Sequence, residues 1–480
     1  MRKNLCMPKH QGPGIWVIIA YLQRQKILTV NQKKHQMICV LCRNYERLEL
    51  PLEKLQMLWY NKANQRERMH GFMDIKTIEK IINETAYVRT GGSPEELRCA
   101  LYLQEACRKL GFEAKLEPFT VAMATIKEAK LTVDGREIPC KGYFCAGSGT
   151  VEAPIYYLRE NSPYSLQQCK GKIVLFDGYL GYWKYQDLLE YGAVGFISYD
   201  GNINYIDRDI DQRELREYVH KGRKLLGVNI NAKDAMELVR IGAKNASITL
   251  EQEEYTADSH NLTLDIPGKT GKYIVFTAHY DSTSLSQGSY DNMSGSIGLL
   301  GIAEALAKQE RNFGLRFIWC GSEERGLLGS KAYVAQHEEA LKDIVLCINL
   351  DMIGCIMGKF AACCTTEEKL VHYIEYFGNE VGFSIKAHQD VYSSDSTPFA
   401  DKGVPALSFA RLAPHNTATI HNSYDTLKLM KAEQVQEDVA FMAAFTERMA
   451  NAKLCPVSRE IPDNVKEKLD FYLLRKRKPE

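Results

Sequence analysis

Three apolar stretches, each followed directly by polar residues, decide the fold of this 480-residue chain. They read YIVFTAHYD at 273–281, LRFIWCGSEE at 315–324 and VLCINLD at 345–351. Near-continuous apolar runs of this length, separated by helical stretches, are typical of parallel strands that helices cover on both faces. The sequence therefore predicts an α/β core, with a mixed, mainly parallel central sheet flanked by helices.

Polar side chains follow each of these three strands. His279 and Asp281 come after the first, Glu323 and Glu324 after the second, and Asp351 after the third. Ligands of such sheets collect where the strands end at their carboxyl side. All five side chains are metal-ligand or acid–base types, and solvated loop charges or helix caps are a poor explanation for three successive strand ends. We therefore expect a chemical site at this edge of the sheet.

Two further residues are weaker candidates when each is taken alone. Asp291 lies in a Gly- and Ser-rich turn between the first strand and its helix, where an N-cap of that helix is the simpler explanation. His421 precedes a helical stretch that starts near residue 432. Because His415 and His421 are the only histidines after His388, an imidazole ligand from this end of the chain must be one of these two.

These motifs, taken in order, resemble the M28 family of co-catalytic dizinc peptidases, of which leucine-type aminopeptidases are typical members. The resemblance covers roughly residues 73–140 and 260–453. It rests on order, residue type and placement at strand ends. The matching motifs are TAHYDS, SYDNMSG, GSEERGLLGS, NLDMIG, SSDSTPFADKGVPALSF and HNSYDT.

The resemblance implies two zinc ions per chain, bridged by Asp291. It implies that His279 and Asp351 complete one site, and that Glu324 and His421 complete the other. Elementary chemistry agrees, because two neighbouring cations need a shared anion to offset their repulsion. One imidazole and one carboxylate for each ion make a nitrogen and oxygen set typical of zinc, although cobalt or manganese could fill similar ligands.

The resemblance also implies three roles in catalysis. Glu323 would be the general base, Asp281 would orient His279, and Tyr392 would stabilise the oxyanion. The residues alone leave alternatives: Glu323 and Glu324 could exchange roles, Asp281 could cap a loop, and Tyr392 could be an ordinary half-buried aromatic. In this mechanism, metals lower the pKa of a water toward ~7, and the general base takes its proton and returns it to the leaving amine.

A second unit lies earlier in the chain, where GKIVLFDG at 171–178 and YGAVGFISYD at 191–200 predict a βαβ unit. These segments resemble the protease-associated (PA) domain that many members of the family carry as an insertion. It would act as a lid or substrate-selecting module, or as a plain structural insertion. The predicted divisions are a basic, poorly ordered extension at 1–71, a peptidase core at 72–140 and 259–455, an inserted α/β PA-like domain at 141–258, and a C-terminal tail at 456–480.

Local signals add detail before the insertion. Ser93, Pro94 and Glu96 have the spacing of a capping box, which predicts a helix from Pro94 to about Leu110 that stops at Gly111. From about 116 to 155 the chain predicts short strands joined by turns such as Asp134-Gly135.

Charge and composition limit the other classes of protein. The formal net charge of +1 argues against a nucleic-acid or membrane-surface role, although residues 1–71 carry +9 and the rest −8. The early apolar run at 15–22 is far shorter than the ~20 residues of a membrane helix, and no secretory cleavage site follows it. The 14 scattered cysteines suit reduced thiols, so we expect a cytoplasmic protein with no stable membrane insertion. Oligomeric state cannot be inferred from these features.

The expected function is that of a zinc-dependent exopeptidase that acts on peptides and removes their N-terminal residues. A carboxypeptidase or dipeptidase on the same core is an alternative, because metal ligands do not report which end of the peptide is held. A non-catalytic scaffold with a peptidase fold is a third possibility. Such proteins usually lose ligands, whereas every expected ligand type is present here.

Overall fold

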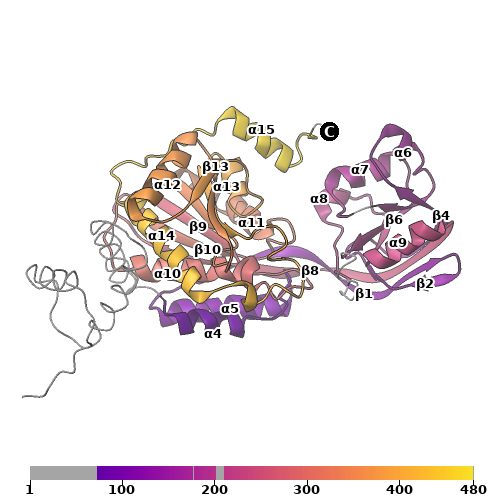
Figure 1. The fold of residues 1–480 in the computed structure, drawn as a ribbon, viewed down its shortest axis with the longest axis horizontal. Helices are drawn as coiled ribbons and strands as arrows, with labels where there is room; N and C mark the ends of the chain where they lie inside the picture. Colours follow the sequence, from indigo (N-terminus) through magenta and orange to yellow (C-terminus); the bar gives the residue numbers. More distant parts are fainter. Residues whose placement is uncertain (1–72, 177, 202–209, 479–480) are drawn as a thin grey trace, which may run out of the picture. The chain divides into compact units, whose positions relative to one another are not determined.

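The computed structural model describes residues 73–176, 178–201 and 210–478, which belong to one compact unit, Gly71–Glu480 (Figure 1). Within these ranges no helix is long and apolar enough to cross a membrane. The predicted basic extension at 1–71, with its apolar run, lies outside the described residues.

The three apolar runs form the centre of the main sheet. They are β9 (Tyr273–His279), β10 (Gly314–Cys320) and β11 (Ile344–Leu350). β9 pairs in parallel with β10 and β11, and β11 pairs in parallel with β14 (Ala406–Leu412). Antiparallel pairs flank this group, between β10 and β8 (Asn245–Ile266) and between β14 and β12 (Lys359–Thr365), which pairs in parallel with β13 (Lys386–Gln389). The predicted mixed, mainly parallel sheet is confirmed.

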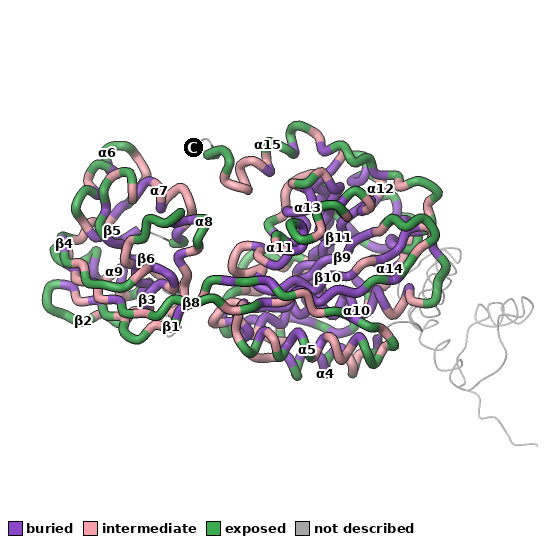
Figure 2. The backbone as a smooth tube through the Cα atoms, turned by 180° about the vertical axis from the view of Figure 1, so that it is seen from behind, coloured by how far each residue is buried: buried purple, intermediate pink, exposed green. Residues whose placement is uncertain are grey.

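Helices cover both faces of this sheet, which explains why its central strands are apolar on both sides. Phe276 and Phe317 stack on one face, with ring centroids 5.0 Å apart, while Val275 and Ile318 point to the other. Burying each such side chain contributes about 1.5–3 kcal/mol. Figure 2 shows β9, β10 and β11 as buried. The first face packs against α4 (Ile75–Glu84), α5 (Pro94–Lys109), α10 (Ser294–Leu306), α12 (Glu368–Val381) and α14 (Ala432–Ala450), and the second against α11 (Leu328–Gln336), α13 (Thr397–Asp401) and α15 (Asp463–Tyr472).

The parallel register places three strand ends at one edge of the sheet. His279 is the partner of Cys320 in the β9–β10 pair, and Thr277 is the partner of Asn349 in the β9–β11 pair. The Thr277 hydroxyl also donates to Oδ1 of Asn349 at 2.8 Å. Residues that follow the three strands therefore leave the sheet within one or two strand spacings of one another.

The capping box on α5 is only half formed. Oγ of Ser93 accepts from the backbone N–H of Glu96 at 3.1 Å, and the helix ends next to Gly111, as predicted. The carboxylate of Glu96 does not return to Ser93. Its oxygens accept instead from the backbone N–H groups of Gly92 at 2.6 Å and of Ser322 at 2.8 Å. Glu96 therefore accepts a hydrogen bond from the distant Ser322 and leaves the local bond to Ser93 unmade.

The prediction of short strands at 116–155 is wrong for its first half. β1 (Lys115–Val133) is a single strand of 19 residues that pairs antiparallel with β8 along almost its whole length. β1 and β8 pair the backbone N–H and C=O groups of each other, so each continues as one long strand. The predicted turn at Asp134-Gly135 is present and joins β1 to β2 (Arg136–Ile138). β8 continues through the predicted division at 258/259, which stays a prediction.

A smaller sheet follows in the region 140–250. Its strands are β4 (Gly149–Leu158), β5 (Ile173–Phe176), β6 (Gly195–Asp200), β7 (Leu226–Asn231) and the short antiparallel β3 (Cys140–Gly142). The first four are mutually parallel. One face packs against α6 (Pro163–Gln167), α7 (Tyr182–Glu190) and α8 (Glu217–His220), and the other against α9 (Ala232–Ile241). The predicted βαβ unit is therefore confirmed as local structure.

Candidate metal centre

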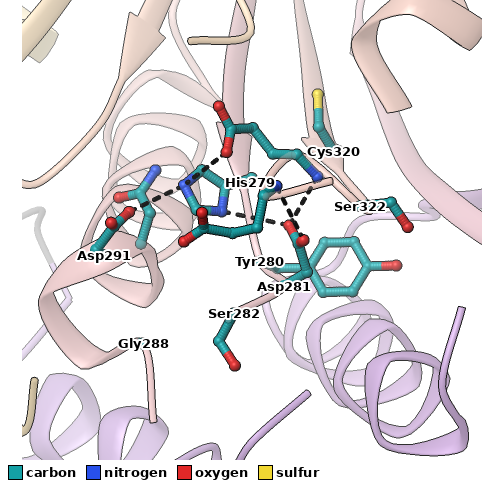
Figure 3. A network of polar contacts seen from close by, with 12 residues as sticks. His279, Tyr280, Asp281, Ser282, Gly288, Asp291, Cys320 and Ser322 are labelled. Carbon is teal, nitrogen blue, oxygen red and sulfur yellow. Dashed lines mark hydrogen bonds and ion pairs between the residues drawn. The ribbon is translucent and has the colours of Figure 1, made fainter. Parts of the chain in front are cut away.

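His279 stands at the carboxyl end of β9, fully buried among carboxylates (Figure 3). Its Nε2 lies 3.1 Å from Oδ1 of Asp291 and 3.7 Å from Oδ1 of Asp351. On the other side of the ring, Nδ1 lies 3.3 Å from Oδ1 of Asp281. The strand end thus presents one imidazole nitrogen to two candidate ligands and the other to a supporting carboxylate.

Asp291 is the centre of the cluster. Its Oδ1 faces His279, and its Oδ2 lies 3.1 Å from Nε2 of His421. The same His421 nitrogen lies 3.1 Å from Oε2 of Glu324. One carboxylate therefore presents a separate oxygen to each of two imidazoles, one from a strand end and one from a distant loop. The alternative of a helix cap is not realised, because α10 starts with Met293 as its N-cap and without a side-chain hydrogen bond.

The turn that carries Asp291 is tied to the end of β11. The side-chain amide of Asn292 donates to the carbonyl of Leu350 at 2.8 Å, and its oxygen accepts from the backbone N–H of Met352 at 3.1 Å. Gly295 lies so close that a Cβ there would meet the Leu350 carbonyl at 2.3 Å. These contacts hold Asp291 and Asp351 at the same edge of the sheet.

Asp281 performs both of the functions that the sequence left open. Besides facing Nδ1 of His279, its two oxygens accept from the backbone N–H groups of Glu323 at 3.0 Å and Glu324 at 3.2 Å. It therefore supports the ring and also holds the loop after β10. Oε2 of Glu323 lies 3.8 Å from Nε2 of His279, while Glu324 turns toward His421. The two adjacent glutamates diverge as a base and a ligand would.

Tyr392 is partly buried next to the cluster. Burial raises the pKa of its hydroxyl above the ordinary value, and the charges of Asp351 and Asp291 raise it further. The phenol is therefore protonated at neutral pH and belongs to the same electrostatic environment as the candidate ligands. The described residues include no hydrogen-bond partner for the hydroxyl itself.

Several supporting residues were missed by sequence reasoning. Asp425 accepts from the backbone N–H groups of Tyr290 at 2.7 Å and Asp291 at 3.0 Å, across 134 residues of chain. Ser394 donates to Oδ2 of Asp351 at 2.7 Å and accepts from the amide of Asn349 at 2.9 Å. Both lie inside motifs quoted above, but their spacing carries no sign of these contacts.

Three residues at the candidate site have an unusual backbone conformation that no sequence pattern predicts. Ser322, Met352 and His421 have φ values of +53°, +62° and +59°, in the left-handed region that non-glycine residues rarely adopt. Each is a candidate site residue or the direct neighbour of one. Such strained positions cluster at functional sites, where the surrounding contacts hold them.

Burial and charge together give the cluster unusual protonation. Burial alone would lower the pKa of His279, but the carboxylates around it, first Glu323 and then Asp281, Asp291 and Asp351, raise it well above the ordinary value. Burial also raises the pKa of Glu323, against the opposing effect of His279. A raised pKa makes a glutamate a stronger base, as a general base requires.

The residues present fit divalent metal ions. One ligand atom each from His279, Asp291 and Glu324 lie within 4.8 Å of one another. Oε1 of Glu324 and Oδ1 of Asp351 are buried without a hydrogen-bond partner in the described chain. Buried carboxylate oxygens without partners are costly unless a cation satisfies them. Imidazole nitrogen with carboxylate oxygen is a donor set that suits zinc.

Comparisons with known proteins agree with this geometry. A model of peptidase family M28 matches residues 261–446, the segment that carries all the candidate ligands. The chain is 26% identical to aminopeptidase YwaD of Bacillus subtilis over 393 residues, which cover 77% of this chain and 82% of that protein. A probable leucine aminopeptidase of Arthroderma otae is 26% identical over 227 residues, covering 42% of this chain and 61% of that protein.

Solved structures support the fold. An aminopeptidase from Aneurinibacillus sp. strain AM-1 has a TM-score of 0.67 at 21% identity, covering 82% of this chain and 98% of that one. The zinc aminopeptidase BSAP from Bacillus subtilis has a TM-score of 0.67 at 24% identity, covering 81% and 99%. The α/β fold of this protein is therefore shared with these peptidases over most of the described chain.

Proposed function

We propose that this protein is a zinc-dependent aminopeptidase that hydrolyses N-terminal peptide bonds. The observation that carries the proposal is Asp291, which presents one carboxylate oxygen to His279 and the other to His421. The similarity to M28 peptidases and to named aminopeptidases supports the same reaction. The substrates are peptides.

The proposed site holds two zinc ions. His279 and Asp351 would bind one, Glu324 and His421 the other, and Asp291 would bridge them. Each ion then has one imidazole, one carboxylate of its own and a share of the bridge, which leaves open positions for water and substrate. Bound zinc would acidify a water molecule and polarise the scissile carbonyl.

The side chains of this protein would supply the remaining chemistry. Glu323, buried and close to His279, would accept a proton from the attacking water and return it to the leaving amine. Asp281 would hold the ring of His279 and the backbone of Glu323 in place. Tyr392, protonated and beside Asp351, would donate to the oxyanion that forms during attack.

The proposal extends to the domains and the compartment. The smaller sheet would be a PA-like domain at 141–258, inserted into a core at 72–140 and 259–455, with a tail at 456–480. Its βαβ topology supports this assignment. The 11 cysteines in the described ranges are all free thiols, which supports a reducing, cytoplasmic location.

The experiment that tests the function uses purified full-length protein and a panel of aminoacyl reporters. We expect hydrolysis that stops with a chelator and returns with zinc, at about two zinc ions per chain by elemental analysis. N-acetylation of a peptide should abolish its cleavage. Cleavage of the acetylated peptide from its carboxyl end would instead favour a carboxypeptidase, and absence of metal after reloading would favour a scaffold.

A further inference from the structure

An arginine from the smaller sheet region lies beside the metal centre. Arg216, directly before α8, is partly buried, and its Nη2 donates to the backbone carbonyl of Glu324 at 2.5 Å. Its Nη1 lies 3.2 Å from the hydroxyl of Tyr218. Because Glu324 is a proposed metal ligand, the guanidinium contacts the backbone of a residue at the proposed metal site.

A second cation, Lys331, lies on α11, a helix that packs against the main sheet. Nζ of Lys331 donates to the carbonyl of Gly326 at 2.9 Å and lies 5.4 Å from the ring centroid of Tyr218. Although the residue as a whole is exposed, partial desolvation by its neighbours lowers the pKa of Lys331, the charge of Arg216 lowers it further, and Glu323 opposes the change. Lys331 therefore interacts electrostatically with Arg216 and with Glu323, the proposed general base.

Neither cation makes an ion pair within the described chain, although Glu214 and Glu323 act on Arg216 and Lys331 from a greater distance. Within the described ranges no carboxylate lies within ion-pair distance of Arg216 or Lys331. Glu214, the nearby carboxylate, is held instead by Arg325 through two contacts of 2.6 and 2.9 Å. The five carboxylates of the proposed metal centre would not neutralise Arg216 and Lys331 either, because two divalent ions would offset nearly all of their charge.

We propose that Arg216 and Lys331 form a carboxylate-binding subsite beside the metal centre, and that the protein prefers peptides with a negative charge close to the scissile bond. The proposal rests on the peptidase function proposed above. A guanidinium with unused donors binds a carboxylate through paired hydrogen bonds, and a nearby ammonium adds a second charge. Unpaired cations at a binding site also disfavour substrates that leave them unpaired.

The carboxylate could come from two places in a peptide. It could be the side chain of an acidic residue at the cleaved end, or the terminal carboxylate of a dipeptide. The first source is tested with glutamyl and glutaminyl reporters, which differ only in the side-chain charge. The second is tested with the dipeptide Leu-Ala and its C-terminal amide.

The test compares kcat/KM of Arg216→Gln, Lys331→Gln and Arg216→Lys with the parent protein, all loaded with zinc. We expect each Gln variant to lose about tenfold on the charged member of one substrate pair and less than about twofold on its neutral partner. Arg216→Lys should retain most of the preference because it keeps the charge. Lys221→Gln, which removes an exposed cation from the same segment, is the matched control and should change neither pair.

Two outcomes would overturn the subsite. An equal loss on all substrates would give Arg216 a general positioning role, and no loss on either charged substrate would remove the role altogether. Calorimetric binding of L-glutamate against L-glutamine provides a readout without turnover, and Arg216→Gln should erase the difference. If the parent protein cleaves none of these substrates, the peptidase proposal fails, while the binding experiment still decides the subsite. Lys331 is exposed, so its variant remains informative if the Arg216 variants fold poorly.

Discussion

The two halves of the proposed metal centre are built in different ways. The buried half consists of His279 and Asp351, which follow neighbouring strands and are at most 5% exposed. Asp281 faces Nδ1 of His279, and Ser394 donates a hydrogen bond to Asp351. Backbone pairing in the sheet brings these two proposed ligands to one edge, and side-chain hydrogen bonds such as that of Ser394 hold Asp351 there.

The other half consists of Glu324 and His421, which both lie in loops, and of these two side chains only that of His421 is exposed. The His421 side chain is 50% exposed, and among the described residues it pairs with the carboxylates of Asp291 and Glu324 alone. A ligand held by loops loses more conformational freedom when it binds an ion than one held by a strand end. We therefore expect one zinc ion to bind tightly and the other more weakly, and variants of the proposed ligands can test this contrast.

Replacing the bridging residue should abolish both halves at once. Asp291→Ala removes the carboxylate that, among the described residues, contacts both imidazoles, so we expect loss of most bound zinc and a fall in activity of at least about a thousandfold. Elemental analysis and kinetics measure the two effects. Asp265→Ala, at an ion pair with Arg316 away from the cluster, is the control. Retention of two ions in the Asp291 variant would contradict the bridge.

Separate changes at the adjacent glutamates should distinguish base from ligand. Glu323→Gln should keep both ions and lower kcat by about 10²–10⁴-fold, the usual contribution of a general base. Glu324→Gln should instead release the more weakly held ion. Zinc content and turnover, measured on the same samples, decide the assignment. The reverse pattern would exchange the two roles.

The two histidines should differ in what they contribute to the metal-free fold. His279→Ala leaves buried carboxylates without a cation, and we expect a loss of about 3–5 kcal/mol in the free energy of unfolding. His421→Ala should cost no more than about 1 kcal/mol, because that ring is half exposed. Urea unfolding of chelator-treated protein measures both. Equal losses would refute the contrast between the halves.

A supporting contact should tune only the buried half. Ser394→Ala removes the hydrogen bond to Asp351, and loss of such an outer contact typically weakens metal affinity about 10–100-fold. Competition with a chromogenic chelator should show the tighter binding step weakened and the weaker step unchanged. Ser393→Ala, which removes only a contact to Tyr472 on α15, is the neighbouring control.

The smallest expected effect is the dependence of zinc affinity on pH. Burial would lower the pKa of both imidazoles, but for His279 the charge of Glu323 and for His421 that of Glu324 raise it above the ordinary value. Their protonated forms stabilise the metal-free fold, and this contribution is lost only as pH rises through the raised pKa. Zinc must displace these protons, so its affinity should still rise between pH 7 and 8, with proton release visible by calorimetry in different buffers. Zinc affinity that does not rise between pH 7 and 8, or binding without proton release, would contradict the raised pKa values.

Much of the fold and of the site was predictable because the signals are local. Apolar runs identified β9, β10 and β11, and the residues directly after them proved to lie at one edge. Parallel register requires that outcome once the strands are adjacent. Asp291 was different, since a turn residue before a helix is usually a cap, and only the family resemblance pointed to a bridge.

The errors have a common physical cause. Glu96 was expected to complete a local capping box, but its carboxylate binds Ser322, which is 226 residues away in the chain. β1 was expected to break into short strands, but pairing with β8 sustains 19 residues. A local pattern states what a residue can do, whereas a partner from elsewhere in the chain decides what it does.

By itself the sequence determined the sheet, the strand ends and the residue types that gather there, because strand formation and parallel register depend on nearby residues and backbone geometry. Only the tertiary structure decided which oxygen of Asp291 faces which histidine, how Asp425 holds its backbone, and that Arg216 reaches Glu324. Except for the contact between His279 and Asp291, which are 12 residues apart, these contacts join segments more than a hundred residues apart. No local pattern records which distant groups will compete for the same donor or acceptor.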